Sequence, residues 1–280
     1  MAAVDCIIKL GGSAVTQKDQ LETLKAGALQ KAAALVAKVS AAGARRCVVV
    51  HGAGSFGHFQ AKQYGVACGS STRSAVSPTL RRGLCLTRLS VTKLNHLVTD
   101  QLVRNGVPAV GISPFGTWKT AFKNISQAGI DTVMDVLDSG YVPVLHGDCA
   151  LDSEQHCCIL SGDTIIEILA QKLSPRRVVF LTDVNGVYSC PPDTSGARLV
   201  NSITVGPDGN MEPPVLTSVL PHDTTGGVSL KLQSAVNIVS RSCGAIPVLI
   251  CKLDSEAAER ACLTGKLEEG EGTQLFFKDI

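Results

Sequence analysis

The sequence has little charge imbalance, few aromatic residues and no long hydrophobic run. Its 26 lysines and arginines against 24 aspartates and glutamates give a net charge of +2, too balanced for a dedicated nucleic-acid or membrane-surface binder. No apolar run approaches the roughly eighteen residues that cross a bilayer. The N-terminal residues lack the basic and apolar regions of a signal peptide. We therefore expect a cytoplasmic protein without nucleic-acid or membrane partners.

The sequence also lacks paired-cysteine motifs. Its eleven cysteines are scattered from Cys6 to Cys262, no C-x-x-C occurs, and the one adjacent pair is Cys157–Cys158. We expect free thiols in a reducing compartment, with neither a disulfide framework nor a structural zinc site. Apolar residues make up 45% of the 280, which allows a large core and excludes disorder for most of the chain.

Short β-branched runs alternate with longer amphipathic runs. The predicted strands cover residues 6–10, 47–51, 108–112, 141–145, 178–181 and 246–251. The predicted helices cover residues 21–43, 80–104, 162–173 and 228–239, with a short helix between 112 and 141. Near-continuous apolar strands separated by helices indicate an α/β fold with a parallel sheet covered on both faces. The segment 185–223 is rich in Pro, Gly, Asp, Ser and Thr and predicts hairpins and loops, with a lid as one option.

The first glycine cluster, Lys9-Leu10-Gly11-Gly12-Ser13, directly follows a predicted strand. A lysine inside an apolar strand is costly to bury unless its ammonium group meets an anion. One interpretation is therefore a phosphate site at the Gly-Gly turn. The other is an edge strand with Lys9 in water. The segment does not fit the Walker-type pattern GxxxxGK[ST].

The second cluster runs from His51 to His58 and has three glycines within residues 52–57. Such a loop lets backbone amides approach a ligand closely, and His58 would donate to an anionic group there. The alternative is a flexible turn with an exposed histidine. His51 is expected to pack at, or cap, the end of the strand.

Three further segments point to the same chemistry. Ser161-Gly162-Asp163 opens a helix, and Asp183 ends a strand, either as a nucleotide contact or as a turn cap. Gly226-Gly227 precedes a helix whose Lys231 can reach back over the loop, unless Lys231 is an ordinary surface lysine. Several lysines beside separate glycine turns, with no acyl-transfer triad, favour phosphoryl transfer. These lysines are Lys9, Lys18 and Lys231.

Taken in order, these motifs resemble the amino acid kinase superfamily. The resemblance rests on KLGGS, the glycine-rich loop, SGD, LTDVNGVY and DTTGG followed by Lys231, and extends to Gly272-Thr273-Gln274. HGAGSFGH together with PVLHGD and LSGD is similar to the isopentenyl phosphate kinase family, of which His58 is the mark. The resemblance implies a three-layer αβα sandwich with a mostly parallel central sheet, as a single domain over residues 1–280. It also implies an acceptor-binding part, about 1–160, and an ATP-binding part, about 161–280.

The activity implied by the resemblance is transfer of the γ-phosphoryl group of ATP to isopentenyl phosphate, with Mg²⁺, by a homodimer. The implied catalytic residues are Lys9, Lys18, His58 and Lys231. The implied ATP-binding residues are Lys9, Leu10, Gly11, Gly12, Ser13, Gly54, Asp183, Gly227 and Lys231. The implied acceptor-binding residues are Ala53, Gly54, His58, Arg88 and Gly162. No side chain is assigned to a metal, and Asp148 and Asp163 are candidates for orienting lysines or metal-bound water.

The expected mechanism needs no carboxylate base. A phosphomonoester has a second pKa of about 6, so its attacking oxygen is already largely anionic at neutral pH. His58 would hold that phosphate, and Mg²⁺ would be held mainly by ATP phosphates and water. The apolar tail needs a pocket, to which one or two of the apolar residues of the helix 80–104 would contribute, the others being core; the candidates are Leu84, Leu86, Leu89, Val91, Leu94 and Leu97. The closing GTQLFF departs from the usual GTxI, which we expect to affect packing rather than chemistry.

Two alternatives stay open. One is a related kinase acting on another small phosphate or phosphonate, because His58 would recognise the anion and not the tail. The other is a non-catalytic nucleotide-binding regulator, which we would expect to lack Lys9, Lys18 or Lys231. All three lysines are present.

Overall fold

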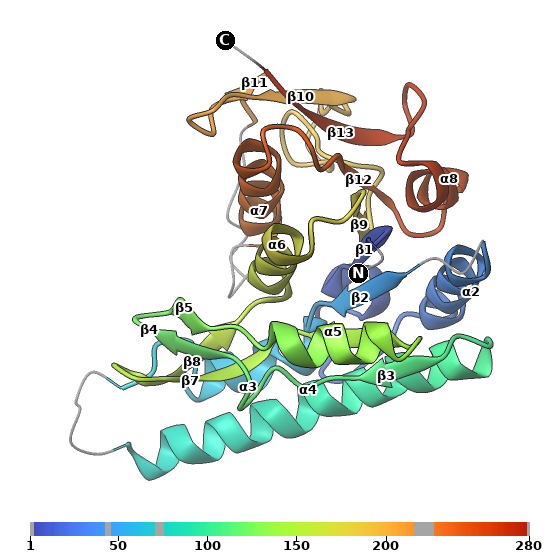
Figure 1. Cartoon of the computed structure of the whole chain (residues 1–280). Coiled ribbons are helices and arrows are strands. Elements are labelled where there is room, and N and C mark those ends of the chain that lie inside the picture. Colours follow the sequence, from blue (N-terminus) through green and yellow to red (C-terminus); the bar gives the residue numbers. More distant parts are fainter. Residues whose placement is uncertain (1–2, 43–45, 71–75, 216–226, 279–280) are drawn as a thin grey trace.

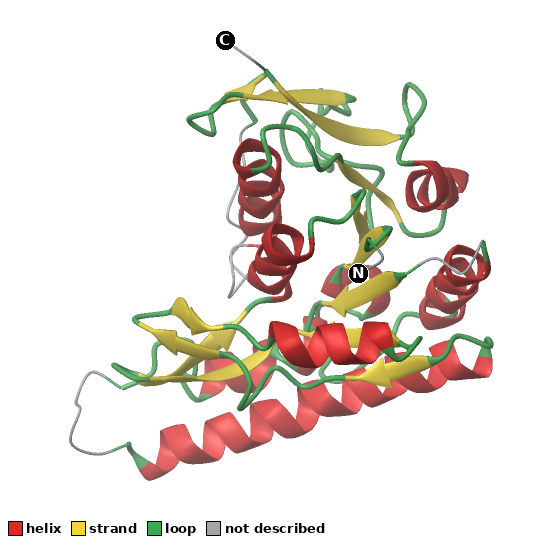
Figure 2. Ribbon diagram, viewed as in Figure 1, coloured by secondary structure: helices red, strands yellow, loops and turns green. Residues whose placement is uncertain are grey.

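A nine-stranded, mostly parallel sheet forms the centre of the molecule (Figures 1 and 2). The computed structural model describes residues 3–42, 46–70, 76–215 and 227–278. The strands of this sheet are β1 (Cys6–Leu10), β2 (Cys47–His51), β3 (Ala109–Gly111), β6 (Val142–His146), β9 (Val178–Thr182), β10 (Ser202–Val205), β11 (Met211–Glu212), β12 (Val248–Lys252) and β13 (Gly272–Phe277). Their order across the sheet is β11-β10-β13-β12-β9-β1-β2-β6-β3. Only the β10–β11 and β12–β13 pairs are antiparallel among the described strands of this sheet.

Helices cover both faces of this sheet. They are α1 (Gly12–Val15), α2 (Ala28–Ala41), α3 (His58–Gln63), α4 (Pro78–Arg104), α5 (Ile130–Asp138), α6 (Gly162–Leu173), α7 (Gly227–Arg241) and α8 (Glu256–Thr264), with a 3₁₀ turn at Gly54–Phe56. One hydrophobic core joins the sheet to α5, α6 and α7, and a second joins the other face to α1, α2, α4 and α8. This arrangement confirms the predicted α/β three-layer sandwich.

The inner strands are buried throughout because both of their faces pack against helices. Every residue of β1, β2, β6 and β9 is buried. Consecutive residues serve opposite cores: Ile7 belongs to one and Ile8 to the other. The period of two along a strand explains this alternation. It also explains why these strands are apolar at nearly every position, the signal used to predict them.

A second sheet of four strands lies beside the first and was not predicted from the sequence. Its strands are β4 (Lys119–Ala121), β5 (Asn124–Gln127), β7 (Asp148–Asp152) and β8 (His156–Leu160), in the order β5-β4-β7-β8. The antiparallel β7–β8 hairpin leads directly into α6. A third, small core beside this sheet contains Ala61, Val66, Leu80, Cys149 and Cys157.

The central sheet divides into an N-terminal and a C-terminal group of strands. β1 pairs in parallel with β2 on one side and with β9 on the other. All strands beyond β9 come from the C-terminal part of the chain, and β2, β6 and β3 come from the N-terminal part. The boundary between these two groups of strands falls between β8 and β9 in the sequence. Assignment of acceptor and ATP to the two parts stays a prediction.

The start of α2 was predicted too early. The helix begins at Ala28, after Gly27, whose φ of 69° is left-handed. The preceding residues form a loop that is closed by a bridge between Thr16 and Leu24. A left-handed residue interrupts a right-handed helix, so the apolar spacing before Gly27 reflects loop packing.

Within 185–223, the predicted hairpin is present as β10–β11, and residues 216–223 lie outside the described residues. The hydroxyl of Thr273 accepts from the Val187 amide at 2.8 Å and donates to the Val200 carbonyl at 2.6 Å. This threonine therefore ties the 187–200 loop to β13.

Two further expectations concern the whole chain. All eleven cysteines are free thiols. None of the helices in the described ranges is long and apolar enough to span a membrane.

Candidate functional site

Four glycine turns meet where strands of the two sheets end. If Gly12 carried a Cβ atom, that atom would lie 2.6 Å from the Gly54 nitrogen, so the two loops touch through their backbones. A Cβ on Gly147 would lie 3.3 Å from the Gly162 nitrogen and 3.6 Å from the Ala53 nitrogen. The turns meet at the carboxyl ends of parallel strands, and the crevice outside these ends is where α/β sheets bind ligands.

The backbone amides at this crevice are suited to anions. Gly12 and Gly162 begin α1 and α6, and Ala53 directly precedes the 3₁₀ turn. Amides in a first helical turn have no acceptor within their own helix, so they are available to a ligand. Ala53 is partly exposed.

Lys9 points into this crevice from the centre of the sheet. Its side chain is 3% exposed, and its Nζ lies 2.6 Å from Oδ1 of Asp163. The edge-strand interpretation is therefore wrong, because β1 is flanked by β2 and β9. A Cβ on Gly162 would lie 2.9 Å from Cε of Lys9, so glycine at this position leaves room for the lysine.

The carboxylate of Asp183 gathers two lysines. It accepts a hydrogen bond from the Ser13 hydroxyl at 2.9 Å and lies 3.4 Å from Lys18 Nζ and 3.8 Å from Lys25 Nζ. Burial alone would raise the pKa of Asp183, but Lys18, Ser13 and Lys25 together lower it to about 2. Asp183 is thus more than a turn cap. Lys25 was not among the residues expected from the sequence.

Lys231 completes the cluster of cations from α7. Its Nζ donates to the Thr182 hydroxyl at 3.2 Å. Burial lowers the pKa of Lys231, and Lys9 adds to this effect, whereas Asp163 opposes it. The interpretation of Lys231 as an isolated surface lysine is therefore wrong. Gly227 begins this helix, and residues 223–226 before it lie outside the described residues.

On the other side of the crevice, Arg88 of α4 is held by three groups. Its Nη2 donates to the Ser113 hydroxyl at 2.9 Å, its Nε lies 3.3 Å from Oδ1 of Asp148, and its guanidinium stacks 4.0 Å from the centre of the Phe115 ring. Asp148 therefore orients an arginine and not a lysine. Asp163 orients Lys9, as expected.

His58 is half-buried at the first position of α3, directly after the glycine loop. Leu10, by contrast, has no exposed surface, and its carbonyl accepts from the Gly52 amide at 2.9 Å. The side chain of Leu10 therefore belongs to the core rather than to a ligand contact.

Two fully buried histidines lie beneath the loops. His51 and His146 stack with ring centres 5.5 Å apart. Burial, followed by the neighbouring His146, lowers the pKa of His51 to about 3, and burial also lowers the pKa of His146. Packing of His51 at the strand end is confirmed. His146 was not singled out, because a lone strand-end histidine gives no signal by itself.

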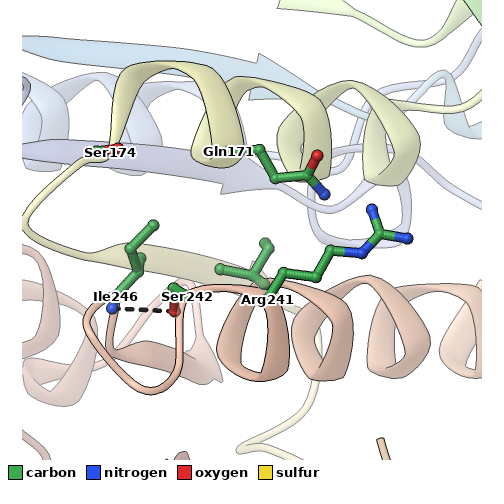
Figure 3. Close-up of a pocket in the computed structure, with 6 residues that line it drawn as sticks. Gln171, Ser174, Arg241, Ser242 and Ile246 are labelled. Atoms are coloured by element: carbon green, nitrogen blue, oxygen red, sulfur yellow. Dashed lines mark hydrogen bonds between the residues drawn. The ribbon is translucent and has the colours of Figure 1, made fainter. Parts of the chain in front are cut away.

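A hollow of about 150 Å³ between α6 and α7 is separate from this site (Figure 3). It is lined by Gln171, Ser174, Ile238, Arg241, Ser242 and Ile246. Arg241 is bound to Glu167 at 2.9 Å. Ser174 lies at the carboxyl end of α6, about 18 Å along the helix from the crevice.

Known proteins of one family match this chain over most of its length. The family model of the amino acid kinase family matches residues 6–252. An isopentenyl phosphate kinase of Arabidopsis thaliana is 38% identical, over 95% of this chain and 92% of that protein. One from Methanothermobacter thermautotrophicus is 34% identical, over 96% of this chain and 98% of that protein.

Solved structures agree with these matches. An isopentenyl phosphate kinase structure is 30% identical, covers 96% of this chain and 99% of its own, and superposes with a TM-score of 0.79. The product complex of the Thermoplasma acidophilum enzyme is 25% identical and covers 97% of this chain and 99% of its own, with a TM-score of 0.76. A UMP kinase from Ureaplasma parvum, 14% identical with a TM-score of 0.60, shares the fold alone.

Proposed function

This chain belongs to the amino acid kinase family and, within it, to the isopentenyl phosphate kinases, and from this premise we propose how its residues divide the work. The protein is a kinase that phosphorylates isopentenyl phosphate, with ATP as the phosphoryl donor. The observation that best supports the residue roles is the meeting of three lysines with four glycine turns in one crevice. Phosphoryl transfer needs such positioning and charge neutralisation more than it needs covalent chemistry.

The ATP phosphates lie, in this proposal, against the amides of Gly12 and Ser13, between Lys9 and Lys231; the Gly11 amide already donates to the Leu181 carbonyl at 2.8 Å, so Gly11 contributes the close turn rather than a donor. Lys9 cannot move far, because it is buried and paired with Asp163. Lys18 differs: its side chain is 63% exposed, so it can rotate from Asp183 to the transferring group. We therefore assign ground-state phosphate binding to Lys9 and Lys231, and transition-state stabilisation to Lys18.

Mg²⁺ belongs with the nucleotide in this proposal. The two nearby carboxylates already have partners, Asp163 with Lys9, and Asp183 with Ser13 and Lys18. The ion would accordingly be coordinated by ATP phosphates and water, and when bound it would neutralise charge on those phosphates.

The acceptor phosphate is placed against the amides of Ala53, Gly54 and Gly162, with His58 and Arg88 as side-chain donors. Both donors can carry positive charge, and charge-assisted hydrogen bonds would offset the repulsion between the acceptor and ATP. No general base is required, because the attacking phosphate oxygen is already largely anionic at neutral pH.

The isoprenoid tail is placed against the small third core. Leu84 of α4 packs on that core, as do Tyr64, Phe115 and Ile159, all of them only partly buried. Phe115 also stacks on Arg88, which links the apolar surface to the phosphate site. The other α4 leucines serve differently: Leu94 is fully buried core and Leu89 is 69% exposed.

We also propose a cytoplasmic homodimer. Leu89 and Val103 are 69% and 54% exposed and lie two heptads apart on α4, so they share one face of the helix. A second copy packed on this face would cover both. The free thiols are in keeping with a reducing compartment. Leu89→Glu should shift the mass measured by light scattering from dimer to monomer; an unchanged mass would contradict this interface.

The activity is tested by following ATP- and Mg²⁺-dependent formation of diphosphate from isopentenyl phosphate. Acetylglutamate, carbamate and a short alkyl phosphonate serve as competing acceptors. Turnover of isopentenyl phosphate in preference to the others is the expected result. Turnover of another phosphate or phosphonate alone would keep the mechanism and change the substrate. ATP binding without any turnover would favour a regulator.

The residue roles are tested with His58→Ala and Lys18→Ala. His58→Ala should raise KM for isopentenyl phosphate at least about tenfold, with KM for ATP little changed, since one charge-assisted hydrogen bond is lost. Lys18→Ala should lower kcat with acceptor KM largely kept. Lys172→Ala, which changes an exposed lysine in the last turn of α6, is the control and should match the wild type. Equal losses for both substrates in His58→Ala would remove its assigned role.

A further inference from the structure

Two neighbouring strands, β2 and β6, each end in a histidine that is followed by a glycine. His51-Gly52 closes β2, His146-Gly147 closes β6, and the parallel register places His51 opposite His146. Their rings are stacked with an angle of 19° between the planes. Both rings are fully buried, directly beneath the proposed acceptor site, and neither has a role in the mechanism above.

The hydrogen bonds define the tautomer of these rings. In each histidine, Nδ1 lies 3.0 Å from the carbonyl oxygen of the glycine that follows. A carbonyl can only accept, so each Nδ1 carries the hydrogen. The Nε2 of His51 lies 3.1 Å from the amide nitrogen of Asn95, which also donates to the Val144 carbonyl at 3.2 Å. Nε2 of His51 is therefore an acceptor, and the ring is neutral.

Each of these contacts fixes one peptide plane. Among the described residues the only cis peptide is Glu212–Pro213, so Gly52–Ala53 is trans. In a trans peptide the C=O and N–H groups point in opposite directions. Because the Gly52 carbonyl is held against the His51 ring, the Ala53 amide hydrogen is directed away from it. His146 holds the Gly147 peptide in the same way.

Glycine makes this restraint necessary. A glycine peptide rotates more freely than any other, and a flipped Gly52–Ala53 plane would turn a carbonyl oxygen toward an incoming phosphate. The Ala53 and Gly162 nitrogens both lie within 3.6 Å of the point where Gly147 would carry a Cβ. A small displacement of the Gly147 peptide would therefore change the space between these two amides.

We propose that His51 and His146 are positioning residues for the acceptor phosphate: His51 clamps the Gly52–Ala53 peptide so that the Ala53 amide stays oriented, and His146 clamps the Gly147 peptide so that the space between the Ala53 and Gly162 amides is kept. This inference rests on the proposed function, which places the phosphate there. Neutral rings suit the role, because each Nδ1 donates its hydrogen bond without adding a positive charge near Lys9 or Arg88. Burial lowers the pKa of both rings, which keeps them neutral at physiological pH.

The test uses the different reach of two amide side chains. His146→Asn places its NH₂ near the position of Nδ1, whereas His146→Gln places it near the position of Nε2. Within the described residues Nε2 of His146 has no hydrogen-bond partner and lies 3.8 Å from Oδ2 of Asp148, so the hydrogen bond under test is the one at Nδ1. We expect His146→Gln and His146→Leu to raise KM for isopentenyl phosphate about tenfold or more. His146→Asn should stay within about threefold of the wild type, and KM for ATP should change less than twofold in all three.

A purely structural role would give another pattern. Equal rescue by Asn and Gln, or parallel increases in both KM values, would overturn the proposal. If His146→Leu does not fold, the KM values of His146→Asn and His146→Gln for isopentenyl phosphate still distinguish the two roles. Nitrogen NMR of histidine-labelled wild-type protein gives a second measurement, in which Nε2–H tautomers at His51 and His146 would overturn the proposal directly.

Failure of the proposed function is distinguishable from failure of this inference. Binding of inorganic phosphate can be measured by calorimetry without any turnover. Phosphate binding that is weakened in His146→Gln and retained in His146→Asn would support the clamp even if isopentenyl phosphate were not the substrate. Phosphate binding equal in all variants would overturn it.

Discussion

Lys9 is the residue whose environment depends most on the fold. A lysine in an apolar strand is compatible with an exposed edge or with a buried ion pair, and only the position of β1 between β2 and β9 decides. Its partner, Asp163, is 154 residues away in the sequence. The sequence could therefore indicate that Lys9 matters, whereas the pairing required the structure.

Asp163→Asn should destabilise the protein by about 3 kcal/mol, because it leaves the Lys9 ammonium buried without its counter-charge. The same change should abolish most turnover, since Lys9 would lose its fixed position. Urea unfolding and initial rates measure the two effects. Asp254→Asn is the matched control: it removes an aspartate from Lys31 in a pair that is more than half exposed, and should cost less than about 1 kcal/mol. Similar losses in the two variants would contradict the assignment.

The buried histidines predict how stability depends on pH. The pKa of His51 is about 3 in the folded protein and about 6.5 when unfolded, so between these values the unfolded state binds more protons. Stability is complete above about pH 6.5 and falls as the pH drops. From pH 7 to pH 5 the loss from His51 alone is about 2 kcal/mol.

His51→Asn keeps a donor near the Nδ1 position but does not titrate, so it should remove that part of the pH dependence. Urea unfolding of both proteins at pH 7 and pH 5 provides the comparison. The carboxylates of Asp152 and Asp183, with pKa values of about 2, lose their contribution only below about pH 4 and do not confuse this window. Equal slopes in the two proteins would show that His51 does not titrate as described.

At the scale of elements, the glycine turns act by contact between backbones. The Gly12 and Gly54 loops approach so closely that neither has space for a side chain at the contact. The letters of residues 52–57 also spell G-x-G-x-x-G, a spacing associated with dinucleotides. The spacing of the glycines therefore does not identify the ligand. The lysines around these loops limit the class of ligand to phosphates.

Gly12→Ala should separate these two loops. Its Cβ would lie 2.6 Å from the Gly54 nitrogen and 2.8 Å from its Cα, so one backbone must shift. We expect a loss of about 2 kcal/mol in stability and at least a tenfold rise in KM for ATP. Gly140→Ala is the control, because it has open space and only a positive φ of 83°. It should cost about 1 kcal/mol and leave the kinetic constants unchanged; altered kinetics there would mean that general destabilisation explains both variants.

The elements that could be predicted are those whose sequence pattern lies within the element itself. The boundaries of α6, β1 and β2 agree with the sequence prediction, because their apolar periods and flanking glycines are local. The second sheet was missed, because its short strands mix polar and apolar residues. There the Asp152 carboxylate accepts from the amides of Phe122 and Lys123, at 3.2 and 2.8 Å, and fixes a turn of two left-handed residues. Such a contact across the sequence leaves no pattern in either segment.

At the scale of the whole molecule, the site depends on the continuity of the central sheet. β1 carries Lys9 and belongs to the N-terminal group of strands, and its neighbour β9 leads to Asp183 in the C-terminal group. The two hydrophobic cores also take residues from both groups. ATP, placed between Lys9 and Lys231 in the proposal, would therefore stabilise both groups of strands.

This coupling predicts a single unfolding transition that ATP shifts as a whole. Trp118, the chain's single tryptophan, is fully buried in the N-terminal part, so its fluorescence reports on that part alone, whereas far-UV circular dichroism reports on both. The two unfolding curves should coincide. ATP with Mg²⁺ at about 100 times its Kd should raise the unfolding free energy seen by Trp118 by about 2.7 kcal/mol.

A chain built from two independent units would behave differently. The fluorescence transition would then separate from the dichroism transition. Isopentenyl phosphate, added in place of ATP, provides the complementary measurement, because its proposed site lies in the N-terminal part. If each ligand shifts both signals equally, the two groups of strands unfold together. Their folding is then coupled through the β1–β9 pairing, since that is where the two groups join.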